Sequence, residues 1–200
     1  MKGKQSKFHP LFPWILILPW VLFTLGCASA KGAKGDVYAD KRMDFTSLKS
    51  MAVMPFENLA ANPAATGRVR DIFMVKLLAS GAVYVVPPGE VAYAASRLGI
   101  QAPWNPTPEE VVKLAGLMKV NGVVTGVLRE YGEVRSGSAI SNVVSVGIRL
   151  FEGQTGKVVW SASSTKGGVG VWDRLFGGGG EPMNNITEKA VDDLLDNLFK

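Results

Sequence analysis

The chain has 200 residues, of which 47% are hydrophobic and 20% are charged, and its 22 basic and 17 acidic residues give a formal net charge of +5. A chain of this length and apolar content can bury one core, so the composition excludes a disordered protein. The presence of a single cysteine excludes a small domain held together by disulfides.

The N-terminus has the pattern of an export signal. Three lysines precede an uncharged apolar run at residues 11–26, which is shorter than the roughly 20 residues that a membrane-spanning helix needs. The run leads into Thr24-Leu25-Gly26-Cys27 and is followed by small residues. This segment resembles a bacterial lipoprotein signal, and the resemblance implies cleavage before Cys27 and acylation of that residue. The alternative is an uncleaved N-terminal anchor.

Cleavage there changes the chemistry available to the mature chain. Three lysines and the only histidine, His9, leave with residues 1–26, so 19 basic and 17 acidic residues remain. This mixed surface argues against nucleic-acid binding, which needs a concentrated basic face. Without a histidine or a free thiol, the mature chain lacks the ligands of zinc and copper sites and the groups of a Ser-His-Asp or Cys-His mechanism. We therefore expect no cofactor, no metal and no enzymatic activity.

The mature chain reads as a flexible tether followed by one domain. Residues 27–46 are small or charged and lack an apolar period, which is typical of a linker, so the domain is expected at 47–200. Two buried parallel strands are predicted at 48–55 and 82–86, because a helix that begins after Asn62 and ends before Gly81 separates them.

Two more helices are predicted at residues 89–98 and 107–119. The second of them starts with a capping box, in which Thr107 and Glu110 each accept a hydrogen bond from the backbone of the other. Proline at the first helical position supports the same start.

After Gly122 the hydrophobic period becomes that of strands, with β-rich stretches at 123–131, 139–151 and 157–165. Apolar and small or polar residues alternate in the middle stretch, which predicts an antiparallel meander with one buried face. An amphipathic helix with Val191, Leu194, Leu195 and Leu198 on one side closes the chain. The predicted fold class is α/β (α+β), a single domain with a mixed sheet in the order β-α-β-α-α-β-β-β-α.

Two apolar features outside this pattern are candidate partner-binding sites. The glycine-rich loop 167–180 contains Trp172, Leu175 and Phe176, and exposed aromatic residues in a loop favour a protein partner or the membrane interface. Trp104 lies among prolines and is either a lid over the core or a surface recognition residue. The glycines at 153–157 do not match a phosphate-binding loop, because no helix and no Ser or Thr follows, and a hairpin turn is favoured.

Four short motifs, in this order, resemble a known family: residues 51–59 (MAVMPFENL), 84–87 (YVVP), 120–126 (VNGVVTG) and 155–160 (TGKVVW). They are similar to periplasmic lipoproteins related to the curli secretion component CsgG, the penicillin-binding-protein activator LpoB and the N-terminal domain of TolB. They also resemble a smaller family of uncharacterised lipoproteins that includes a meningococcal surface antigen. The resemblance covers about residues 46–199 and implies a non-enzymatic envelope domain that works through protein contacts.

These features together predict an outer-membrane lipoprotein whose domain faces the periplasm. It would be held to the membrane by acyl chains on Cys27 and act as an accessory or assembly subunit for secretion, transport or peptidoglycan synthesis. Ala28, directly after the cysteine, resembles the outer-membrane sorting pattern.

Two alternatives remain open at this stage. One is a ligand-binding or enzymatic domain with a cleft near Glu57 and Asn58, at the carboxyl end of the first predicted strand. The other is a homo-oligomer joined through strand edges or through the loop at 167–180.

Overall fold

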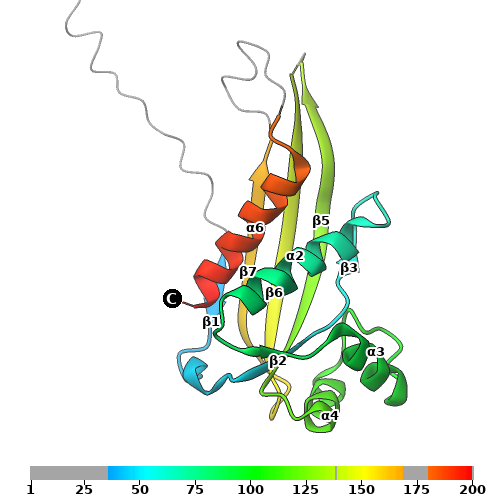
Figure 1. Ribbon diagram of the computed structural model, residues 1–200, viewed down its shortest axis with the longest axis vertical. Coiled ribbons are helices and arrows are strands. Elements are labelled where there is room, and N and C mark those ends of the chain that lie inside the picture. Colours follow the sequence, from blue (N-terminus) through cyan, green and yellow to red (C-terminus); the bar gives the residue numbers. More distant parts are fainter. Residues whose placement is uncertain (1–35, 138, 169–179, 200) are drawn as a thin grey trace, which may run out of the picture. The chain divides into compact units, whose positions relative to one another are not determined.

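The computed structural model describes residues 36–137, 139–168 and 180–199, which form a seven-stranded mixed sheet with helices on both of its faces (Figure 1). The strand order is β1-β7-β6-β5-β2-β4, and β3 pairs with β5 outside this path. The strands are β1 (Val37–Ala39), β2 (Ser50–Val53), β3 (Glu57–Asn58), β4 (Tyr84–Val85), β5 (Gly122–Ser136), β6 (Ala139–Glu152) and β7 (Val158–Gly167).

The helices connect these strands in the way that the polarity of the sheet requires. They are η2 (Phe45–Ser47), α2 (Ala65–Ala79), α3 (Pro88–Arg97), α4 (Pro108–Met118) and α6 (Met183–Leu198). β2 is parallel to β4 and β5, because helices lie between these strands in the chain. β5, β6 and β7 are antiparallel neighbours joined by hairpins. The sheet is therefore parallel in its early part and antiparallel in its late part.

Helices α2 and α6 cover one face of the sheet and lie side by side in Figure 1. Phe73 of α2 and Leu194 of α6 are buried there with Trp160 of β7. Helices α3 and α4 lie on the other face and bury Val91 and Leu114 in a second, smaller cluster that includes residues of β2 and β5. Full burial of such side chains contributes about 1.5–3 kcal/mol each, so the two clusters hold the helices on opposite faces.

The meander has the alternation that the sequence predicts. Val144, Val146, Ile148 and Leu150 of β6 are buried in the cluster under α2 and α6. The residues between them point to the opposite face, because successive side chains of a strand alternate. A register shift between Leu128 and Glu130 puts Arg129 at a bulge in β5.

Two of the motifs that carry the family resemblance meet in the core. The ring of Phe56 lies on the backbone of Gly126, where a Cβ atom would be 2.7 Å from two ring carbons. Phe56 also packs edge to face on Phe73, with 6.0 Å between ring centroids. Glycine at position 126 is thus required by the close approach of the aromatic ring.

The predicted fold class and the order of its main elements are confirmed. Thr107 and Glu110 form the predicted capping box of α4. α2 begins at Ala65, and Asn62 accepts a hydrogen bond from the Ala64 N–H just before the helix instead of capping its first turn.

The structure differs from the sequence prediction at the start of the domain. Residues 36–46, predicted as the end of a flexible tether, belong to the sheet and its surroundings. β1 pairs antiparallel with β7, and the Asp44 carboxylate accepts a hydrogen bond from the Thr46 N–H at 2.9 Å at the start of η2. β1 is short and exposed, so backbone pairing holds it in place and its side chains leave no apolar pattern in the sequence.

Two strands also differ from their predicted form. Residues 132–136, predicted as part of a turn, continue β5, and the hairpin with β6 is correspondingly longer. β4 was expected to be a buried strand, but it is at the edge of the sheet, with Val85 buried and Tyr84 61% exposed.

Candidate functional site

Several residues predicted to carry function lie outside the described part of the chain. They are Cys27, Trp172, Leu175 and Phe176. Their predicted roles in acylation and partner binding stay predictions.

Glu57 and Asn58 form β3, which follows the carboxyl end of β2, the strand predicted at residues 48–55. The side chain of Asn58 is used within its own loop, because it donates to the Asn62 carbonyl at 2.9 Å and accepts from the Ala60 N–H at 3.0 Å. Neither residue lines the pocket or the hollow described below. These contacts assign Asn58 a structural role in the loop and give the alternative of a ligand cleft no support.

Trp104 is 40% exposed in the loop between α3 and α4, so it does not form a closed lid over the core. The next residue, Asn105, accepts a hydrogen bond from Arg149 at 3.4 Å. This contact places the Trp104 loop beside the strand face that carries Arg149. The structure therefore leaves Trp104 available as a surface contact.

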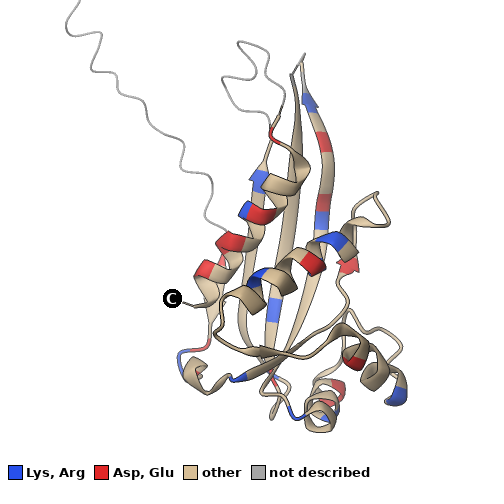
Figure 2. Cartoon of the chain, viewed as in Figure 1, with Lys and Arg blue, Asp and Glu red and all other residues tan. Residues whose placement is uncertain are grey.

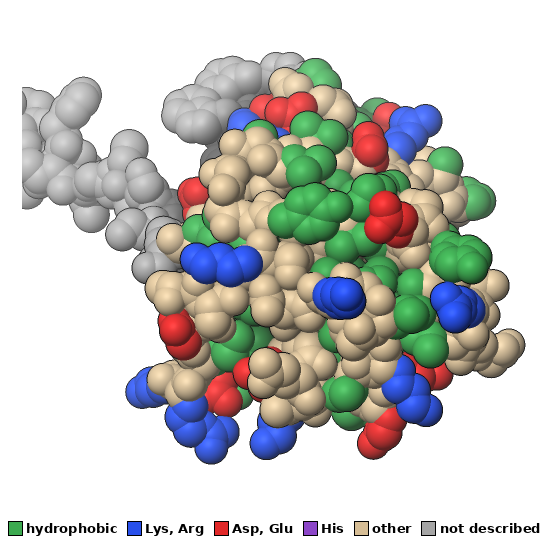
Figure 3. Space-filling view, turned by 60° about the horizontal axis from the view of Figure 1, so that its bottom comes forward, with side chains coloured by type: hydrophobic (Ala, Val, Ile, Leu, Met, Phe, Trp, Pro, Cys, Tyr) green, Lys and Arg blue, Asp and Glu red, His purple; other side chains and the backbone are tan. Residues whose placement is uncertain are grey.

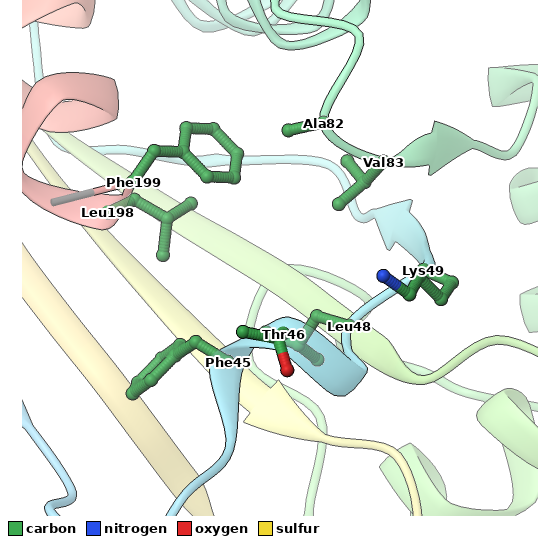
Figure 4. Close-up of a pocket in the computed structure, with 8 residues that line it drawn as sticks. All are labelled: Phe45, Thr46, Leu48, Lys49, Ala82, Val83, Leu198 and Phe199. Carbon is green, nitrogen blue, oxygen red and sulfur yellow. The ribbon is translucent and has the colours of Figure 1, made fainter.

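An apolar pocket of about 320 Å³ lies where η2, the segment before β4 and the end of α6 meet (Figure 4). Leu198, Phe199 and Val83 point toward it, and Phe199 is 42% exposed. We call it the Phe199 pocket; its lining residues are Phe45, Thr46, Leu48, Lys49, Ala82, Val83, Leu198 and Phe199.

The Phe199 pocket is suited to an apolar side chain beside a negative group. The ammonium nitrogen of Lys49 faces the space, and Lys49 is the one charged residue among the described residues that line it. Figure 3 shows the same lower end of the domain, where hydrophobic side chains gather in patches between separate basic residues. A partly exposed aromatic residue at the edge of a concave apolar surface is typical of a protein-contact site.

A second hollow, of about 430 Å³, lies on the face of β5, β6 and β7 opposite to α6. We call this surface the open face; its lining residues are Asp36, Val127, Arg129, Gly147, Ile148, Arg149, Ser161, Ala162 and Ser163. Most of its floor is made of small residues. Two arginines provide its positive charge and Asp36 its negative charge.

Arg129 of the open face lies over a glycine of the neighbouring strand. A Cβ atom at Gly147 would be 2.8 Å from Nη2 of Arg129, so the guanidinium rests on the glycine of the neighbouring strand. Within the described residues, neither Arg129 nor Arg149 forms an ion pair with a carboxylate. The open face therefore presents two cations that could meet an acidic surface.

Helix α6 carries such a surface on its solvent side. Glu188, Asp192 and Asp196 are spaced by four residues and so lie on one side of the helix. We call them the acidic row (Figure 2). Lys76 of α2 is 2.8 Å from Asp192 and 3.7 Å from Glu188, and the hydrogen bond to Asp192 raises the pKa of the Lys76 ammonium above its ordinary value. One lysine thus partly offsets three carboxylates.

Arg70 of α2 is a partly buried cation, and burial is the main influence on its pKa. Its Nη2 donates to the Val53 carbonyl at 2.5 Å, at the end of β2, while its Nε is buried without a partner among the described residues. Burial lowers the pKa of the guanidinium. The contact joins α2 to the end of β2, which is a structural role.

The described residues provide no metal site and no membrane-spanning helix. Among them, no group of three or more His, Cys, Asp or Glu side chains is placed to hold a metal ion. No helix in this part of the chain is both long and apolar enough to cross a bilayer.

Sequence reasoning did not find the Phe199 pocket or the open face. The alternation in β6 showed that Arg149 and Gly147 point away from the main core, but it did not show whether a helix covers them. The Phe199 pocket is built from three segments far apart in the chain, and no local pattern marks it.

Comparison with solved structures identifies relatives of the fold. PelC from Paraburkholderia phytofirmans, described as a dodecamer, matches with 18% identity over 82% of this chain and 96% of its own, with a TM-score of 0.55. Lipoprotein GNA1162 from Neisseria meningitidis matches with 21% identity over 74% of this chain and 99% of its own, with a TM-score of 0.53. The hypothetical protein CT253 from Chlamydia trachomatis matches with 16% identity, 76% and 96% coverage and a TM-score of 0.51.

These likenesses show a shared fold. They confirm the fold expected from the resemblance to the lipoprotein family that includes a meningococcal member. No family model and no curated protein sequence matches the chain.

Proposed function

We propose that this chain is a non-enzymatic lipoprotein, anchored in the outer membrane, whose periplasmic domain acts as an accessory or assembly subunit of an envelope system through protein contacts. The observation that carries the proposal is the lipoprotein-type signal at residues 1–26, followed by Cys27 and, after a short linker, by a domain with the fold of lipoprotein GNA1162. Secretion, transport and peptidoglycan synthesis are the candidate systems.

The distance between anchor and domain supports work close to the membrane. Eight residues lie between Cys27 and Asp36, where the described part of the domain begins, so the step from Cys27 to Asp36 is nine residues long. Even fully extended, nine residues reach about 30 Å, so the first strand stays within that distance of the bilayer surface. Several acyl chains give stable attachment, because each buried methylene contributes about 0.8 kcal/mol.

The side chains of the mature chain favour binding over catalysis. Its histidine leaves with the signal and its cysteine becomes the acylated residue, so common nucleophile and base pairs are missing from the sequence. The Phe199 pocket offers a partner an apolar depression with one cation, Lys49, at its edge. The pocket therefore fits a partner segment in which an apolar side chain stands beside an acidic residue.

Self-association is a second element of the proposal. PelC, which shares the fold, is described as a dodecamer. The open face of the sheet supports a homo-oligomer, because within residues 36–137, 139–168 and 180–199 no helix covers the polar and charged groups that these three strands present there.

Site-specific photo-crosslinking tests the partner contact. In intact cells, Phe199 is replaced with photoreactive benzoylphenylalanine in the full chain, and Tyr93, 68% exposed on α3, is replaced in the matched control. We expect a cross-link to one envelope protein from position 199 and not from position 93. We also expect the Cys27→Ala change to abolish the cross-link, because the domain would leave the membrane. Equal labelling of abundant proteins from both positions would contradict the proposed contact.

A further inference from the structure

The sheet is covered unevenly. α2 and α6 cover one face along β5, β6 and β7, whereas α3 and α4 cover the other face beside β2, and no helix of the described residues covers the open face. The acidic row of α6 points away from the sheet on the covered side. One domain therefore carries an acidic surface and a basic surface on opposite sides of the same strands.

We propose that a second copy of this chain covers the open face with its helix α6, so that the acidic row of one copy meets Arg129 and Arg149 of the next. The inference deepens the proposed function, since it rests on the self-association included there and names the two surfaces that join. It does not depend on which envelope protein is the partner.

The shape of the open face allows a helix to approach. Gly147 and Ser145 of β6 are buried, and Ser161 and Ser163 of β7 are half-buried. The large side chains over this floor are the two arginines, and the Arg129 guanidinium lies directly on Gly147. Sheets stack at about 10 Å face to face, and the small residues of this floor leave room for a helix to approach as the next layer. A second copy would thus complete the layer that each domain lacks.

The charges also match in spacing. The Arg129 guanidinium lies over Gly147, two residues along β6 from Arg149, and two strand residues span about 7 Å. Residues four apart on α6 are separated by about 6 Å along the helix axis, which is the step between Glu188 and Asp192 and between Asp192 and Asp196. Two carboxylates of the acidic row can therefore face the two arginines at once, with Asp36 at the margin.

The placement of the surfaces fixes the type of assembly. A surface that meets a different surface on the next copy gives a head-to-tail contact, which closes into a ring or continues as a filament. Two copies alone would each keep one unused surface. Lipid anchoring of all copies in one plane favours closure into a ring.

Cysteine cross-linking in intact cells tests this contact in the full chain. The natural cysteine, Cys27, is the expected acylation site, so introduced thiols are the ones that react with a short bis-maleimide. Ser163→Cys labels the open face and Asp192→Cys labels the acidic row. We expect the double variant to give a ladder of dimers, trimers and larger species, while each single variant gives none.

Control variants show whether cross-linking depends on the proposed contact between the open face and the acidic row. Ser163→Cys combined with Ser96→Cys, an exposed position on α3, should give no ladder. Asp196→Cys replaces Asp192→Cys in a second double variant, because Asp192 also pairs with Lys76. Two outcomes contradict the proposal: no ladder from either double variant at wild-type protein level, or a strong dimer from Ser163→Cys alone, which would mean that open faces meet each other.

Charge exchange gives an independent result. We expect Arg149→Asp and Asp196→Arg each to weaken assembly about tenfold when expressed alone, and co-expression of the two to restore it, because each mixed junction again pairs opposite charges. Failure of the mixture to recover would overturn the charge pairing. If assembly fails while photo-crosslinking from position 199 still finds an envelope protein, only the self-association is lost and the proposed partner function stands.

Discussion

Gly156 lies in the β6–β7 turn, and its replacement by alanine gives the sharpest test of how this hairpin positions α4. Gly156 has φ +68°, a left-handed conformation, and an added Cβ would collide with the backbone of Pro108, the first residue of α4. Two costs follow. The left-handed conformation costs a residue with a Cβ about 1 kcal/mol, and forcing apart packed backbone adds about 1–3 kcal/mol.

Gly99→Ala is the matched control, because it shares one of these costs. Gly99 has φ +67°, but a Cβ there would meet nothing within 4 Å. We expect Gly99→Ala to lower the free energy of unfolding by about 1 kcal/mol, and Gly156→Ala to lower it by about 2–4 kcal/mol.

The measurement is urea unfolding of the purified chain, followed by circular dichroism and tryptophan fluorescence. The two probes should give the same midpoint if unfolding is two-state. Equal losses in the two variants would refute the packing argument, because only the conformational cost would then be present at Gly156.

Three further changes test individual contacts. Thr107→Ala removes the capping box of α4 and should cost about 1 kcal/mol of unfolding free energy, whereas Thr155→Ala, at a hydroxyl in the exposed β6–β7 turn, should cost less. Phe73→Ala should cost about 3–5 kcal/mol, because the 1% exposed ring packs on Phe56 in the larger core cluster; a loss below 1 kcal/mol in the same urea experiment would contradict its central position. The hydrogen bond to Asp192 raises the pKa of Lys76 above the ordinary 10.5, so their pairing stabilises the fold at neutral pH by less than about 1 kcal/mol. This stabilisation is lost as the pH rises through the raised pKa, because the lysine then loses its charge. Unfolding from pH 8 to pH 12 should therefore show a steeper loss for the wild type than for Lys76→Met, and identical slopes would show that the pair contributes nothing.

The start of α4 and the buried face of β6 could be predicted from the sequence, because neighbouring residues alone determine them. Thr107, Pro108 and Glu110 predicted the start of α4 because capping depends on side chains within four residues. The alternation from Val144 to Leu150 predicted a strand with one buried face because side-chain direction has a period of two.

Features that depend on distant partners could not be predicted in the same way. β1 has no apolar pattern because backbone pairing with β7 places it, and Tyr84 was expected to be buried because nothing local shows that β4 is an edge strand. The Phe199 pocket and the open face depend on which surfaces the helices leave bare. The partner-binding roles of Trp172, Leu175 and Phe176 stay predictions.

Attachment through Cys27 is the central claim, because the proposed location, partner contact and ring all depend on it. The direct measurement is metabolic labelling with a radioactive fatty acid, combined with fractionation of cells that carry the wild type or Cys27→Ala. We predict that the wild type is labelled and sediments with the outer membrane, whereas the variant is unlabelled and leaves that fraction. Unchanged labelling and membrane content in Cys27→Ala would contradict the claim.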